Sequence, residues 1–157
     1  MRSAVHATAV DIGGHGVLLR GPSGSGKSDL ALRLVDRGAR LIGDDIVQLD
    51  ASDGLPVIRC APNIVGQIEV RGVGICSVDY VQSAPLRMVV EFATEIDRMP
   101  PEHQQALLID YAVPLLMLDP FQASSALKVE LALRSVIDAG LMPVAMQDAA
   151  ANESLGF

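Results

Sequence analysis

The sequence predicts an α/β domain with a central mixed sheet, flanking helices and an N-terminal β-hairpin. Residues 21–28 have the sequence Gly-Pro-Ser-Gly-Ser-Gly-Lys-Ser and match a phosphate-binding loop at every constrained position. An apolar strand pattern at residues 16–20 precedes this loop and a helical pattern follows it, as such a loop requires. Half of the residues are apolar and only 3% are aromatic, which suits aliphatic buried strands. Together these observations predict a P-loop nucleotide-binding fold.

The N-terminal hairpin is predicted from alternation and turn chemistry. Residues 4–12 alternate between apolar and polar side chains as a half-buried strand does. Glycine-rich residues 13–16 favour a tight turn into the strand at 16–20. The second strand of this hairpin therefore delivers the phosphate-binding loop.

The elements after the loop continue the α/β pattern. Residues 28–37 have helical periodicity, with an apolar face formed by Leu30, Ala31 and Leu34. Residues 40–43 form a short apolar strand, residues 46–49 continue in extended form, and residues 55–60 are the return strand after a turn.

The middle of the chain is less regular. Residues 68–78 are β-like but are interrupted by charges and by Gly72 and Gly74, which indicates a bend. Residues 86–92 predict a strand. Pro100-Pro101 is typical of a helix start, and we expect a polar helix from there to residue 107 or 108.

The last elements are a strand and a helix. Residues 112–118 predict a strand in which Pro114 counts against a fully paired central position. Residues 124–139 predict a helix that stops at Gly140 and carries an i,i+4 pair between Glu130 and Arg134. Its apolar positions include Leu127, Leu131 and Ile137.

Length and composition bound the organisation. The 157 residues fit one domain, which we place at residues 1–146, with residues 147–157 as a flexible tail. No apolar run can span a bilayer and no signal-peptide core follows Met1, so we expect a cytoplasmic protein. Cys60 and Cys76 are too far apart for a metal motif and are expected to be reduced core thiols.

The net charge of −7 argues against binding to nucleic acid or to an anionic membrane, since both require basic surfaces. A small molecule or another protein is the expected partner.

The loop residues indicate a nucleotide bound with Mg²⁺. Lys27 should reach the β- and γ-phosphates, and the Ser28 hydroxyl is placed to ligate Mg²⁺. The remaining loop residues contribute mainly through their backbone, and all of them except the proline can turn an N–H group toward the phosphates: Gly21, Pro22, Ser23, Gly24, Ser25 and Gly26.

Asp44 and Asp45 follow the next strand, at the edge of the sheet where ligands bind in α/β folds. One carboxylate can serve the metal and the other can accept a proton from an attacking hydroxyl. The alternative is an exposed acidic turn. Glu69 and Arg71, in the glycine-punctuated segment, can likewise be a solvated strand face.

Several motifs together resemble one family. Residues 37–45 end in the paired aspartates, residues 69–75 have the sequence Glu-Val-Arg-Gly-Val-Gly-Ile, Asp97-Arg98 stands before the expected helix, and His6 lies upstream of the loop. In residues 5–139 the chain resembles the catalytic domain of the HPr kinase/phosphorylases. These bacterial enzymes phosphorylate a serine of the phosphocarrier HPr, and many members also reverse that reaction.

The resemblance implies a protein-serine kinase that uses ATP and Mg²⁺ on an HPr-like phosphocarrier of a phosphotransferase system. It implies that Asp45 is the proton acceptor, with Asp44 open as the other candidate, and that Ser28 and Glu69 hold Mg²⁺. It implies that Lys27, Arg71 and Arg98 interact with the negative charge of the phosphates. It also adds His6 to the catalytic group and implies a homo-oligomer of six subunits.

Two departures from the family pattern affect the prediction. The strand that carries His6 begins almost at Met1, so we expect the short, single-domain form. Residues 120–125 have the sequence Pro-Phe-Gln-Ala-Ser-Ser where the family has Arg-Pro-Gly-Arg-Asn. Because both arginines are missing, the reverse phosphorylase reaction is in doubt.

Two other functions are compatible with the loop. One is a small-molecule P-loop kinase, which usually carries an arginine-rich lid and gives no reason for the motif at residues 69–75. The other is a non-catalytic ATP-sensing module that binds an HPr-like partner.

Overall fold

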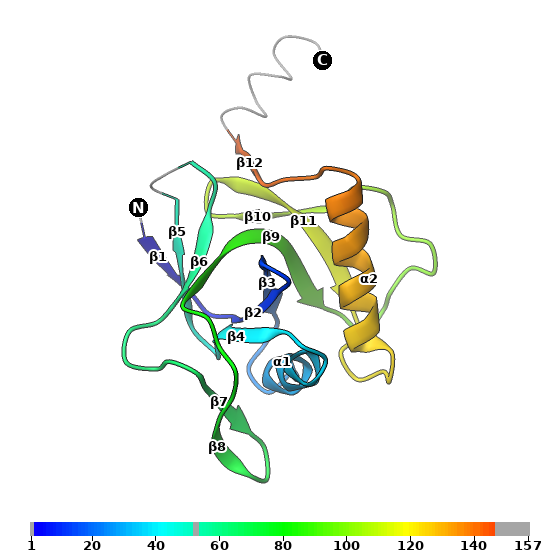
Figure 1. The fold of residues 1–157 in the computed structure, drawn as a ribbon. Coiled ribbons are helices and arrows are strands. Elements are labelled where there is room, and N and C mark those ends of the chain that lie inside the picture. Colours follow the sequence, from blue (N-terminus) through cyan, green and yellow to red (C-terminus); the bar gives the residue numbers. More distant parts are fainter. Residues whose placement is uncertain (1, 52–53, 147–157) are drawn as a thin grey trace, which may run out of the picture.

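The computed structural model describes residues 2–51 and 54–146, in which two helices and twelve strands form a mixed α/β fold (Figure 1). The strands are β1 (Arg2–Val5), β2 (Thr8–Ile12), β3 (His15–Arg20), β4 (Arg40–Gly43), β5 (Val47–Asp50), β6 (Val57–Cys60), β7 (Gln67–Val70), β8 (Gly74–Ser77), β9 (Ser83–Phe92), β10 (Gln105–Leu108), β11 (Tyr111–Leu118) and β12 (Val144–Ala145). The helices are α1 (Lys27–Asp36) and α2 (Ser125–Asp138).

The predicted N-terminal hairpin is present between β2 and β3, which pair antiparallel. Gly13 and Gly14 connect them with φ angles of 61° and 92°, and two positive φ values in a row are those of a type I′ turn, whose twist matches that of the flanking strands. The strand predicted at residues 4–12 is divided at His6 and Ala7, because β1 pairs with β5 while β2 pairs with β3 and β4.

The centre of the large sheet is the set of strands β3, β9 and β11, in which β9 pairs parallel with both neighbours. Alternate residues of these strands enter two cores. Val17 and Leu19 belong to a core that includes α1 and α2, whereas Leu18 belongs to a second core with residues of β5, β6 and β10. Burial on both faces explains the continuous apolar runs in these strands.

Both helices therefore lie on one face of the central strands (Figure 1). Helix α1 buries the predicted positions Leu30, Ala31 and Leu34. Its last turn is linked to α2 by Arg37, whose Nε lies 2.6 Å from Oε1 of Glu130. This hydrogen bond, with the attraction of the same carboxylate, raises the pKa of Arg37 above its ordinary value.

Two of the interactions expected for helix α2 differ in the structure. Glu130 pairs with Arg37 and not with Arg134, since its carboxylate turns toward the neighbouring helix. Leu127 and Leu131 are exposed, because the face that packs on the sheet is formed by Ala126, Val129 and Leu133. Gly140 follows the helix end with a φ of 69°, as predicted.

The helix predicted from Pro100 to residue 107 or 108 is wrong. Residues 93–104 form an irregular loop, and β10 pairs antiparallel with β11. In β10, Ala106 and Leu108 are buried while Gln105 and Leu107 are exposed, which is the alternation of a strand. Pairing with β11 outweighs the local helix signal of the two prolines.

Pro114 lies where β11 changes partner, which agrees with its expected lack of full pairing. Residues 111–114 pair with β10, and the parallel pairing with β9 begins at Leu115. Proline lacks the N–H that a second ladder at this point would use.

The bend predicted at Gly72 and Gly74 is a hairpin. Strands β7 and β8 form a separate two-stranded sheet beside α1 (Figure 1). Cys60 and Cys76 are free thiols that are only partly buried. No helix in the described ranges is long and apolar enough to cross a membrane. The predicted tail at residues 147–157 lies outside the described residues.

Candidate active site

The phosphate-binding loop connects β3 to α1 at the edge of the sheet. Gly24 and Gly26 have φ angles of 76° and 99°, which residues other than glycine rarely adopt. The first backbone hydrogen bond of α1 runs from Leu30 N to Gly26 O, so the N–H groups of Lys27, Ser28 and Asp29 have no partner within the helix. Such groups at a helix N-terminus bind phosphate oxygens.

Lys27 is folded onto this loop. Its side chain is only 8% exposed, and Nζ donates a hydrogen bond to Gly21 O at 2.7 Å, with Pro22 O at 3.5 Å. The carbonyl contacts keep the ammonium group inside the turn of the loop. A phosphate bound in the loop would therefore meet this charge without a large movement of the side chain.

Asp44 joins three elements through its carboxylate. Oδ1 accepts hydrogen bonds from Ser28 Oγ at 2.6 Å and from Thr8 Oγ1 at 3.1 Å. Oδ2 accepts a hydrogen bond from the backbone N of Glu69 at 3.0 Å. The carboxylate thus ties α1, β2 and β7 together at the loop.

These residues fit Mg²⁺ by their chemistry, because the Ser28 hydroxyl and the Asp44 carboxylate are the oxygen ligands that this ion prefers. In the part of the chain that the structure describes, no three His, Cys, Asp or Glu side chains form a metal cluster. A magnesium ion here would accordingly take further oxygens from phosphates and water, as it does in most nucleotide sites.

Asp45 follows directly and has a different environment. Its φ of 68° is unusual for a residue other than glycine, and its backbone N donates to Thr8 Oγ1 at 3.1 Å. Its side chain is exposed and makes no hydrogen bond or ion pair within the described ranges. The carboxylate of Asp44 is therefore hydrogen-bonded to Ser28, whereas the carboxylate of Asp45 is accessible to a ligand.

Thr8 holds both aspartates and was not singled out by the sequence. It is fully buried, donates to the Asp44 side chain and accepts from the Asp45 backbone. A threonine in a β-like segment is ordinary, so only the spatial approach of β2 to residues 44–45 reveals this function.

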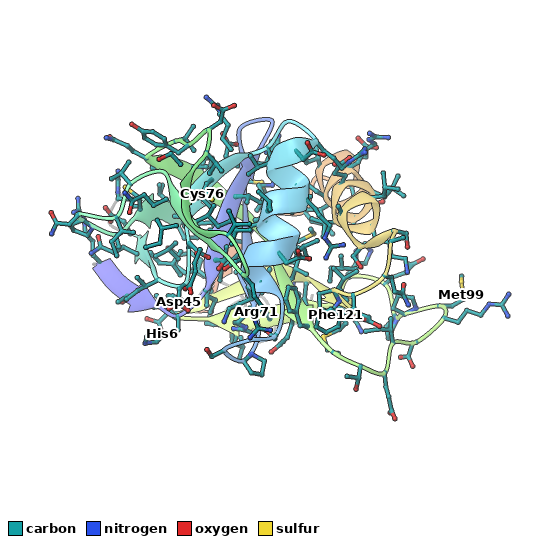
Figure 2. All side chains as sticks on the ribbon, turned by 90° about the horizontal axis from the view of Figure 1, so that it is seen from below. His6, Asp45, Arg71, Cys76, Met99 and Phe121 are labelled. Carbon is teal, nitrogen blue, oxygen red and sulfur yellow. The ribbon has the colours of Figure 1, made fainter. Side chains whose placement is uncertain are left out.

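The other predicted residues are placed as follows. His6, Asp45 and Arg71 lie along one edge of the molecule in Figure 2. His6 is exposed between β1 and β2, and Arg71 is exposed in the turn after β7, with Glu69 two residues before it on the strand. Arg71 makes no ion pair within residues 2–51 and 54–146, so its charge is available to a ligand.

Within a single chain, Arg98 does not lie near the other predicted site residues. It lies in the exposed loop at residues 93–104, next to Met99. Figure 2 shows Met99 at the far edge of the molecule, away from Asp45 and Arg71.

Two hollows elsewhere on the described surface do not coincide with this site. One of about 240 Å³ is lined by residues such as Leu49, Leu86 and Tyr111, on the sheet face opposite the helices. The other, of about 340 Å³, lies between the hairpin turn and the C-terminal ends of α1 and α2. Neither is lined by residues of the phosphate-binding loop.

The loop between β3 and α1, with its buried lysine and its serine–aspartate pair, defines a P-loop nucleotide-binding fold of mixed α/β class. The family model described as "HPr Serine kinase C-terminal domain" matches residues 1–137. The chain belongs to this family, which confirms the resemblance inferred from the motifs.

Individual relatives agree. The HPr kinase/phosphorylase of Clostridium beijerinckii is 41% identical over 95 residues, which cover 56% of this chain and 32% of the relative. That of Bacillus pumilus is 37% identical over 127 residues, which cover 73% and 41%. The chain thus spans less than half the length of these curated relatives.

A solved structure supports the fold alone. The HPr(Ser) kinase/phosphatase from Coxiella burnetii has a TM-score of 0.74 and 24% sequence identity. The similarity covers 85% of this chain and 95% of that one.

Replacement of Thr8 tests whether this buried hydroxyl positions the site. Thr8→Val keeps the shape but removes the donor to Asp44 and the acceptor for Asp45 N, and losing one such buried partner typically costs ~1–3 kcal/mol. We expect the Mg²⁺-dependent part of nucleotide affinity, measured by titration calorimetry with and without Mg²⁺, to fall roughly tenfold. Thr8→Ser, which keeps the hydroxyl, should bind almost as the parent protein does.

Thermal melting of both variants provides the control for unfolding. Equal loss of Mg²⁺-dependent affinity in Thr8→Ser and Thr8→Val would show that the hydroxyl is not what positions the aspartates.

Proposed function

We propose that this chain transfers the γ-phosphoryl group of ATP to a serine hydroxyl on an HPr-like phosphocarrier of a phosphotransferase system. Family membership and the names of the curated relatives support this function. The observation that carries this proposal is the difference in environment between the two aspartates. Asp44 is bonded to Ser28 at 2.6 Å, while the carboxylate of Asp45 is exposed beside it.

Lys27 and the loop backbone would bind the triphosphate. The side chain of Lys27 already lies within the loop, and N–H groups at the start of α1 are unpaired in the helix. When bound, Mg²⁺ neutralises phosphate oxygens, and Ser28 with Asp44 and Glu69 are the residues that would hold it. Binding energy is thus concentrated on the phosphates.

Asp45 would accept the proton of the attacking serine. In this step the serine oxygen forms a bond to the γ-phosphorus, and the bond between that phosphorus and the bridging oxygen of ADP breaks. The hydroxyl proton passes to a carboxylate oxygen of Asp45. His6, exposed between β1 and β2, is proposed to orient the hydroxyl or to share this proton.

Arg71 and Arg98 are proposed to stabilise charge on the transferred group. Arg71 is on the same edge of the molecule as Asp45 (Figure 2). Arg98 would reach the site only if its loop moved or if it came from a neighbouring subunit. A homo-oligomer, with six subunits as the resemblance implies, is compatible with the second route.

One assay separates this function from its two alternatives. The protein is incubated with radiolabelled ATP, Mg²⁺ and a purified HPr-like carrier, and with the same carrier whose acceptor serine is replaced by alanine. Label on the first carrier and not on the second supports the protein-serine kinase. Transfer only to small hydroxyl compounds would favour a small-molecule kinase, and ATP binding without any transfer would favour the sensing module.

Lys27→Ala tests the charge within the loop. We expect the transfer rate to fall by roughly 100-fold or more, because the variant deletes a charge that acts on the phosphates. The fold should persist, since the shape of the loop depends on glycines and backbone. Arg134→Ala, which deletes an exposed positive charge on α2, is the matched control and should transfer normally. A near-normal rate for Lys27→Ala at saturating ATP would contradict this assignment.

Asp45→Asn tests the proton acceptor. Asparagine keeps the shape but not the basicity, so kcat should fall by about 10²–10⁴-fold while ATP affinity changes little. Initial-rate kinetics together with ATP titration separate the two quantities, and Asp138→Asn serves as an exposed control. A loss that appeared wholly as weaker ATP binding would make Asp45 a metal-site residue.

The direction of the reaction is a further prediction. Phosphate attack on a phosphoserine brings two anions together and requires extra positive charge. Residues 121–125 contain no Arg or Lys. The nearby Arg33 is already bonded to Gln122 O at 3.2 Å and to Asp29 at 3.1 Å. We therefore expect weak or absent phosphorylase activity.

The measurement follows pyrophosphate release from the phosphoserine carrier with enzyme, Mg²⁺ and inorganic phosphate. The forward kinase rate, measured on the same preparation, is the reference. A reverse rate comparable with the forward rate would show that arginines at residues 120–125 are dispensable.

A further inference from the structure

Phe121 lies against the phosphate-binding loop and yet is 75% exposed. A Cβ atom built on Gly26 would lie 3.3 Å from the ring atom Cε1 and 3.6 Å from Cζ of Phe121. The edge of the ring therefore lies beside Gly26, at the point where the loop enters α1. Figure 2 places Phe121 on the same side of the molecule as Arg71.

The topology of the sheet accounts for this position. Strands β3, β9 and β11 are parallel neighbours, so their C-terminal ends meet at one edge. Phe92 ends β9 and approaches the other side of the loop, with its Cδ2 atom 3.1 Å from a Cβ built on Gly21. Phe121 follows β11. Both phenylalanines in the described ranges of this aromatic-poor chain thus flank the phosphate-binding loop.

The segment that carries Phe121 is held in place by hydrogen bonds. The backbone N of Phe121 donates to Asp119 Oδ1 at 3.0 Å, and Ser125 Oγ donates to Asp119 O at 2.7 Å. From α1, the Arg33 guanidinium donates to the carbonyl oxygens of Pro120 and Gln122. An exposed ring on a braced segment loses little conformational freedom when a ligand covers it.

We propose that Phe121 is the base-stacking residue for the nucleotide whose phosphates occupy the loop. This inference rests on the proposed function. A purine base offers a flat π-face, and an exposed phenyl ring matches that face but cannot hold phosphate. Because Phe121 lies beside the N-terminus of α1, the phosphates and the base can be bound at the same edge of the sheet.

Stacking alone distinguishes bases poorly, since every base has a π-face. The ring should accordingly contribute to the binding affinity of ATP and of GTP to a similar degree. The alternative occupant of the ring is a segment of the carrier protein, and the experiment distinguishes it from the base.

The experiment compares ATP with inorganic tripolyphosphate, which has three linked phosphates but no base. Calorimetric titrations with Mg²⁺ are made on the parent protein, Phe121→Ala and Phe121→Trp. We expect Phe121→Ala to bind ATP roughly 5- to 100-fold more weakly and tripolyphosphate unchanged, because only ATP uses the ring. Phe121→Trp should keep or increase ATP affinity. Leu131→Ala, which alters an exposed apolar residue of α2, is the matched control and should change neither ligand.

The remaining outcomes each have one meaning. Equal weakening of both ligands in Phe121→Ala would show that the ring shapes the loop and would overturn base stacking. Unchanged ATP affinity together with a raised KM for the carrier would assign the ring to the carrier and would also overturn it. In either case the parent protein still binds ATP, so the proposed kinase function stands. Failure of the parent protein to bind ATP and tripolyphosphate would overturn both.

Discussion

The carboxylate of Asp44 is the interaction on which the arrangement of the site depends. It accepts hydrogen bonds from Ser28, from Thr8 and from the backbone of Glu69, which belong to α1, β2 and β7. These elements are far apart in the sequence, and β7 lies outside the large sheet. The same bonds keep the glycine-rich segment after β7 close to the phosphate-binding loop.

The central strands determine where this site can form. Because β3, β9 and β11 are parallel and buried on both faces, a ligand can approach their backbone only at the edges. Phe92 is the last residue of β9, and the phosphate-binding loop and the segment carrying Phe121 follow the C-terminal ends of β3 and β11. Asp44 and Asp45 follow β4, which pairs with β2 on the far side of the hairpin. One edge of one sheet therefore collects residues from four separate segments.

The sequence was sufficient where the chemistry is local. The loop at residues 21–28, the hairpin turn at Gly13-Gly14 and the face of α1 are each specified by neighbouring residues, and each is present. The prediction of a helix after Pro100 was wrong because the pairing of β10 with β11 is a contact between separate strands, which local sequence signals do not show. The partner of Glu130 was missed for the same reason, since Arg37 lies 93 residues away.

The candidate site shows the same division. Lys27, Ser28 and the aspartates follow from motifs, but the contacts of Thr8 and Phe121 arise only when strands meet in space. Thr8 stands in no pattern that the linear sequence marks, and the segment of Phe121 was noticed only because it lacks arginines.

The charge distribution explains how an acidic chain can bind a polyphosphate. Most of its arginines are neutralised within the fold: Arg2, Arg20, Arg33, Arg37, Arg40 and Arg59 each contact a carboxylate. At the phosphate-binding loop, the donors are instead the amine of Lys27 and the N–H groups at the start of α1. Helix N–H groups attract anions through oriented dipoles and add no net charge. Positive charge that could meet a phosphate is therefore concentrated at one loop while the chain as a whole stays negative.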